Sequence, residues 1–239
     1  MTVGGILGES WQLYTRFFTR FFVVAAAVYL VVDLLNALLA TLFGSGAGVA
    51  TLLALITVLV SLIGTFWLQG ALVYAVVDVR DGRIDTTVGQ LFQRVRPQLG
   101  ALILAGILAG LAIAIGFVLL VVPGLVLLTW WCLIVPVIVI ERKRVGESFS
   151  RSRELVRGHG WTVFGVVVIT AILSGIASGI IQSIFSFLGT FLRYWIGGTI
   201  ANAIVGPFLA IALTLMFFRL AELQQTPGSP APAPASPLE

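Results

Sequence analysis

Long apolar stretches separated by short polar connections dominate this sequence and leave few folds open to it. Hydrophobic residues make up 59% of the 239 residues and charged residues only 10%, whereas about a quarter of the residues of a soluble domain are charged. About twenty apolar residues form a helix long enough to cross a hydrocarbon core roughly 30 Å thick. The sequence therefore predicts an all-α integral membrane protein. We expect six transmembrane helices, at residues 21–43, 49–77, 99–121, 124–140, 162–188 and 196–218.

The basic residues predict how these helices are oriented. Six of the fourteen Lys and Arg residues lie between Arg142 and Arg157, and seven others flank connections on the same predicted side, which leaves only Arg193 on the other side. Cytoplasmic loops carry an excess of Lys and Arg. Both termini are therefore expected in the cytoplasm, with the protein in the cytoplasmic (inner) membrane. Because the basic residues flank apolar spans, they indicate membrane topology and no nucleic-acid partner.

The chain divides into two regions of different composition. Residues 1–222 form the predicted six-span membrane domain, and residues 223–239 form a tail rich in Pro and Ala. Because the tail has little apolar surface to bury, we expect it to be a disordered cytoplasmic extension with partly polyproline conformation.

A short pattern recurs before the first, third and fifth predicted spans. Its three copies are Gly8-Glu-Ser-Trp11, Gly89-Gln-Leu-Phe92 and Gly146-Glu-Ser-Phe149, and around each copy large residues recur at i, i+4, i+7 and i+11. This spacing is typical of a helix with one apolar face. The sequence therefore predicts three repeats, each an amphipathic interfacial helix followed by a transmembrane hairpin. In the third copy, Ser152 replaces one of the apolar residues.

Two segments carry a resemblance to a known family. Residues 130–141 form an apolar run with a proline and a terminal glutamate, and residues 147–161 contain Arg-Ser-Arg-Glu-Leu-Val-Arg-Gly before an aromatic residue. Together with residues 6–14, they resemble the membrane-domain family of glycerophosphoryl diester phosphodiesterases. In some relatives this domain is fused to a soluble phosphodiesterase domain, for which it looks like a membrane anchor. The connections and tail of this chain are too short for such a domain, so phosphodiesterase activity is not expected.

Three arginines and a glutamate around the third interfacial helix are candidate functional groups. Arg153 and Arg157 lie on one flank of that helix, at the height of lipid phosphates, so lipid-headgroup contact is the functional hypothesis and simple anchoring the alternative. Glu141 ends the fourth predicted span. We expect a structural ion pair between Glu141 and Arg151 or Arg153 that fastens the loop to the helix bundle.

Asp33 and Asn36 are polar residues within the first predicted span, three positions apart. A charge at mid-membrane costs several kcal/mol unless it is paired, neutralised or hydrated. One hypothesis is an intramembrane polar site for an ion, a proton or a polar headgroup. The other is an inter-helix hydrogen bond, in which Asp33 or Asn36 pairs with a polar residue such as Gln69, Gln182 or Asn202.

Few residues offer catalytic or metal-binding chemistry. Cys132 is the only cysteine and His159 the only histidine, so neither a disulfide nor a His/Cys metal site is expected. No cofactor motif or clustered catalytic set is visible, which disfavours an enzyme, including an intramembrane lipid enzyme. The sequence favours a non-enzymatic scaffold or accessory protein that engages lipids, including anionic headgroups, a membrane partner or a second copy of itself. The alternative is a small transporter or permease component with a polar site near Asp33.

Overall fold

The computed structural model describes residues 2–42, 49–82 and 86–225. Over these residues the chain forms helices and no strand, and six helical stretches are long and apolar enough to cross a membrane. The prediction of an all-α, multi-pass membrane protein is confirmed. The long helices are α2 (Phe18–Leu42), α3 (Val49–Arg80), α5 (Leu99–Leu119), α9 (Gly160–Ile184) and α11 (Gly198–Gln225), with the fourth stretch divided into α6 (Val121–Trp131) and α7 (Ile134–Glu141).

Three short amphipathic helices precede the helical hairpins, as the repeat pattern predicts. They are α1 (Val3–Arg16), α4 (Val88–Val95) and α8 (Val145–Val156). Matching positions of the three copies hold Ser10, Leu91 and Ser148, and each of these residues is completely buried. The two serines satisfy their hydroxyls by donating to backbone carbonyls one turn earlier in their own helices. The same face of each helix therefore packs against the bundle.

Short non-α-helical turns connect some of these helices. The 3₁₀ turn η1 (Arg96–Gln98) connects α4 directly to α5. Near the start of the last span, α10 (Thr190–Leu192) leads through the π-helical turn η2 (Arg193–Gly197) into α11. Within α11, Pro207 lies inside a helix that continues on both sides.

The fourth predicted span is broken at Cys132 and Leu133, between α6 and α7. Pro136 lies in the first turn of α7, where a proline is tolerated because its missing N–H would have no partner within the helix. The proline therefore lies just after the break, at the start of the second helix. At 11 residues and about 1.5 Å of rise per residue, α6 is too short to cross a membrane by itself.

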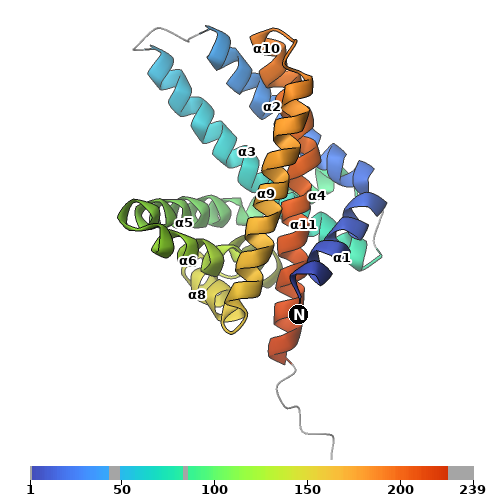
Figure 1. Ribbon diagram of the computed structural model, residues 1–239, viewed down its shortest axis with the longest axis vertical. Coiled ribbons are helices and arrows are strands. Elements are labelled where there is room, and N and C mark those ends of the chain that lie inside the picture. The colour runs from blue at the N-terminus through green and yellow to red at the C-terminus, as the bar shows by residue number, and fades with distance from the viewer. Residues whose placement is uncertain (1, 43–48, 83–85, 226–239) are drawn as a thin grey trace, which may run out of the picture.

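The α5–α6 hairpin consequently has an unexpected direction. Figure 1 shows α5 and α6 packed together on one side of the molecule and lying across the direction of α9 and α11. Val122, in the first turn of α6 next to the hairpin connection, lines the same groove as Gly160 and Trp161 at the start of α9. The sequence placed the turn and the start of α9 on opposite sides of the membrane. The break after α6 accounts for the difference.

Close helix contacts explain one of the small-residue positions in α5. A Cβ atom on Gly106 would lie 1.8 Å from Cζ of Phe66 on α3, whereas a Cβ on Gly110 would meet nothing within 4 Å. Gly106 is thus required for the contact between α3 and α5. The buried side chains of α1, α2, α3, α4, α5, α7 and α11 form the main core, and a second cluster joins α1, α7, α8, α9 and α11.

The last helix extends past residue 222, the predicted end of the membrane domain. α11 continues to Gln225, so Leu223 belongs to the helix and not to the tail. The remaining tail, residues 226–239, and the predicted connection at residues 43–48 lie outside the described residues.

Candidate functional site

The C-terminal half of α8 lines a polar cavity. Ser150, Arg153, Glu154 and Arg157 surround it together with Trp130 at the end of α6, and its volume is about 490 Å³. Ser150, Arg153 and Glu154 lie on α8 and Arg157 directly follows its last residue. Their i, i+3, i+4, i+7 spacing places side chains on one face of a helix. The structure therefore brings together the two arginines predicted to contact a lipid headgroup.

Trp130 holds one of these arginines in a defined position. Cζ of Arg153 lies 4.3 Å from the centroid of the Trp130 ring, which is a cation–π contact. Oγ of the fully buried Ser152 donates to the carbonyl oxygen of Trp130 at 2.6 Å. The serine that interrupts the apolar pattern of the third repeat thus attaches α8 to the end of α6. The stacked guanidinium keeps donors at its edge that suit a phosphate or carboxylate.

Trp130 also lines an apolar groove next to this cavity. The groove lies between α6 and α9 and has a volume of about 520 Å³. Gly158, with φ of +86°, turns the chain from α8 into α9 and also lines the groove. A polar cavity with two arginines and an apolar groove therefore meet at one tryptophan. The other lining residues are Val122, Leu125, Val126, Thr129, Gly160, Trp161 and Phe164.

An ion-pair network fastens α8 beside this cavity. Nε of Arg151 donates to both carboxylate oxygens of Glu141, at 3.0 and 3.1 Å, and its Nη1 donates to Glu154 at 3.2 Å and to Gln224 at 2.7 Å. Partial burial lowers the pKa of the Arg151 guanidinium, but the hydrogen bonds and charges of the two glutamates outweigh burial and raise it above its ordinary value. Arg151 is the predicted ion-pair partner of Glu141, and Arg153 stacks on Trp130 instead.

Helical spacing would pair Glu147 with Arg151 at i+4, but the structure gives Glu147 a different partner. Its carboxylate accepts a hydrogen bond from the backbone N–H of Arg144 at 3.3 Å, at the start of α8. It caps the helix there.

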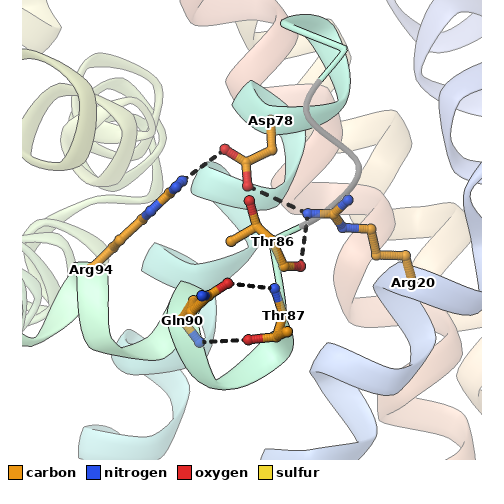
Figure 2. Close-up of polar contacts among 6 residues, drawn as sticks. All are labelled: Arg20, Asp78, Thr86, Thr87, Gln90 and Arg94. Carbon is orange, nitrogen blue, oxygen red and sulfur yellow. Dashed lines mark hydrogen bonds and ion pairs between the residues drawn. The ribbon is translucent and has the colours of Figure 1, made fainter.

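A second ion-pair cluster, centred on Asp78, was not predicted from the sequence. Asp78 is 3% exposed; its Oδ1 accepts from Nη1 of Arg94 at 2.8 Å and its Oδ2 from Nη2 of Arg20 at 3.4 Å. Arg20 also donates to the carbonyl oxygen of Thr86 at 3.3 Å. Figure 2 shows both arginines reaching the Asp78 carboxylate, Arg20 from α2 and Arg94 from α4. The cluster ties the end of α3 to both helices.

The repeats contain a signal that could have revealed this cluster. Arg94 and Arg151 occupy the seventh position of α4 and α8, respectively, and each pairs with an acidic residue near the end of the preceding span, Asp78 or Glu141. The corresponding residue of α1 is Leu13, which carries no charge. The two clusters are thus equivalent connections between successive repeats.

Asp33 is buried and bonded to another helix. Nδ2 of Asn202 on α11 donates to the two carboxylate oxygens at 3.1 and 3.4 Å, whereas Asn36 is exposed. Asp33 and Asn36 therefore have different surroundings, and a polar site that includes both of them stays a prediction. A cavity of about 130 Å³ lies nearby and is lined by Tyr29 and Gln69, among others, but not by Asp33.

No metal site emerges from the described part of the chain. Within it, no three His, Cys, Asp or Glu side chains gather where they could hold a metal ion. Sγ of Cys132 lies 3.2 Å from the carbonyl oxygen of Thr129 as a hydrogen-bond donor, and His159 precedes the first turn of α9. The clearest chemistry in the structure is the pairing of the arginine-lined cavity with the apolar groove.

Comparison with known families and proteins gives one match. Residues 86–237, more than half of the chain, match a family described as a domain of unknown function (DUF7847). The matched region includes the second and third repeats and therefore contains both the polar cavity and the groove. Neither the curated proteins nor the solved structures gave a match.

Proposed function

Because the chain belongs to the DUF7847 family, a domain of unknown function, we propose its function from the geometry of the site: a non-enzymatic membrane protein that binds a phospholipid. The lipid phosphate binds Arg153 and Arg157, and one acyl chain lies in the groove between α6 and α9. The supporting observation is that the polar cavity and the apolar groove share Trp130. A phospholipid has the same division into a charged head and an apolar chain.

The two arginines account for recognition of the phosphate. Guanidinium groups form charge-assisted, often bidentate hydrogen bonds with phosphate oxygens. The stacking of Arg153 on Trp130 limits the orientations open to its side chain, so less conformational entropy is lost when the phosphate binds.

The groove contributes position more than affinity. An acyl chain that enters the groove leaves surrounding lipid and not water, so the hydrophobic effect gives little net gain. Selectivity among lipids must therefore come mainly from the headgroup cavity. The groove selects molecules that have a chain attached to the phosphate.

The distribution of charge supports a location and an orientation for this activity. With thirteen of the fourteen basic residues on one predicted side, we place both termini and α8 on the cytoplasmic face of the cytoplasmic membrane. The bound lipid then belongs to the cytoplasmic leaflet. In this role the protein is a scaffold or accessory protein, which presents its lipid-binding surface to a membrane partner or to a second copy.

Transport through a site at Asp33 is less well supported. The carboxylate bonds to Asn202, and Asp33 does not line the neighbouring cavity. The resemblance to glycerophosphoryl diester phosphodiesterase membrane domains stays a prediction.

Lipid retention measured by native mass spectrometry tests the proposal. The protein is purified in a mild detergent and exchanged with a defined phospholipid, and R153Q/R157Q is compared with R142Q/K143Q. The control pair removes the same charge from the same connection but lines neither the cavity nor the groove. At roughly 1 kcal/mol per arginine at a lipid surface, the site variant should bind about 30-fold more weakly.

The outcomes separate three explanations. Loss of bound lipid in the site variant alone supports the proposal. Equal loss of lipid in both variants indicates unspecific attraction to basic residues. No loss of lipid in the site variant shows that the two arginines do not bind it. Excess inorganic phosphate should leave the lipid bound, because the acyl chains hold the lipid in the micelle at a high local concentration beside the cavity. Displacement by phosphate would assign the cavity to a soluble phosphate compound instead.

A further inference from the structure

The headgroup cavity contains a carboxylate beside its two arginines. Glu154 lines the cavity between Arg153 and Arg157 in the sequence of α8. Its Oε2 accepts from Nη1 of Arg151 at 3.2 Å, and its Oε1 accepts no hydrogen bond from the residues that the structure describes. A site for a purely anionic headgroup gains nothing from this carboxylate, because it repels the phosphate that the arginines attract.

This arrangement of charges points to the class of lipid. Building on the phospholipid site proposed above, we propose that the cavity selects a phospholipid whose headgroup carries a primary ammonium next to its phosphate. The phosphate binds Arg153 and Arg157, and the ammonium donates to Glu154. Ethanolamine phospholipids have this chemistry, with two carbon atoms between the phosphate oxygen and the nitrogen.

Other common headgroups satisfy only part of the cavity. A glycerol headgroup has a phosphate but no positive charge for Glu154. A choline headgroup has the positive charge but no N–H to donate, whereas an ammonium has three donors. A serine headgroup carries a carboxylate of its own, which the Glu154 carboxylate repels.

The exposure of Glu154 limits the size of the preference. Its side chain is 64% exposed, so its pairing with an ammonium resembles a surface ion pair. Such a pair corresponds to a preference of about two- to fivefold. The arginines therefore set the affinity for phospholipid in general, and Glu154 sets the choice of headgroup.

Competition between lipids with identical acyl chains tests the inference. The full-length protein is equilibrated with equal amounts of phosphatidylethanolamine and phosphatidylglycerol, and the bound fraction is measured by native mass spectrometry. The wild type should retain about two- to fivefold more of the ethanolamine lipid, and E154Q should retain both about equally. E154D keeps the charge and should keep most of the preference.

E147Q is the matched control. Glu147 lies on the same helix and caps its start, but it lines neither the cavity nor the groove, so E147Q should show the wild-type preference. E154Q should stay folded because Arg151 keeps its bonds to Glu141 and Gln224. An unchanged preference in E154Q, or a wild-type preference for the glycerol lipid, overturns the inference. Neither result bears on whether the cavity binds phospholipid at all, which the R153Q/R157Q variant tests separately.

Discussion

Replacing Asp78 with Asn should destabilise the protein strongly, because one buried carboxylate connects three helices. The Asp78 side chain is 4% exposed, and its partners Arg20 and Arg94 are 14% and 42% exposed. Removing one partner of a buried ion pair typically costs about 3–5 kcal/mol. We take the lower end of this range, about 3 kcal/mol, because solvent screens Arg94 and because Arg20 still donates to the carbonyl of Thr86.

Thermal unfolding in detergent micelles, followed by tryptophan fluorescence, measures this effect. For a chain of about this length, 1 kcal/mol shifts the midpoint Tm by about 2–4 °C. D78N should therefore unfold about 6–12 °C below the wild type.

The equivalent change in the next repeat, E141Q, is the internal comparison. The Glu141 side chain is 21% exposed, and Arg151 would keep its bonds to Glu154 and Gln224. We expect E141Q to cost only about 1 kcal/mol. If D78N lowers Tm by no more than E141Q does, the burial of the cluster does not determine its contribution and the reasoning fails.

Two further substitutions test the packing and the intramembrane hydrogen bond by the same unfolding assay. Gly106→Ala should destabilise by about 1–3 kcal/mol, because its Cβ would overlap the ring of Phe66, whereas Gly110→Ala has open space and should leave Tm unchanged; equal effects of the two would contradict the predicted clash. Asp33→Asn should leave Tm equal to or above that of the wild type, because the new amide oxygen can still accept from Asn202 and no charge is buried. A clearly lower Tm would show that the Asp33 charge itself contributes to stability.

The helices themselves follow from local features of the sequence. Runs of apolar residues and the i, i+4, i+7, i+11 spacing predict the long helices and the three interfacial helices, because hydrophobic content and helical periodicity are properties of neighbouring residues. The pair of Glu141 and Arg151 was predictable for the same reason, since only ten residues separate them. The two cavity arginines lie one turn apart at the C-terminal end of α8, so their meeting at one surface also followed from spacing.

Contacts between distant segments were not predictable in this way. Asp78 lies 58 residues from Arg20, and Asp33 lies 169 residues from Asn202. Several polar residues were equally possible partners for Asp33. Only the packing of α2 against α11 selected one of them and left Asn36 exposed.

The sequence by itself determined the class of the protein, its helical stretches and its threefold repeat, because these depend on composition and period. The tertiary structure alone decided the direction of the α5–α6 hairpin and the meeting of the headgroup cavity with the groove at Trp130. The physical reason is that nearly every face of a membrane helix is apolar, so hydrophobicity cannot specify which faces meet. Helix partners are chosen by close packing, as at Gly106, and by a few polar contacts, as at Asp78 and Ser152.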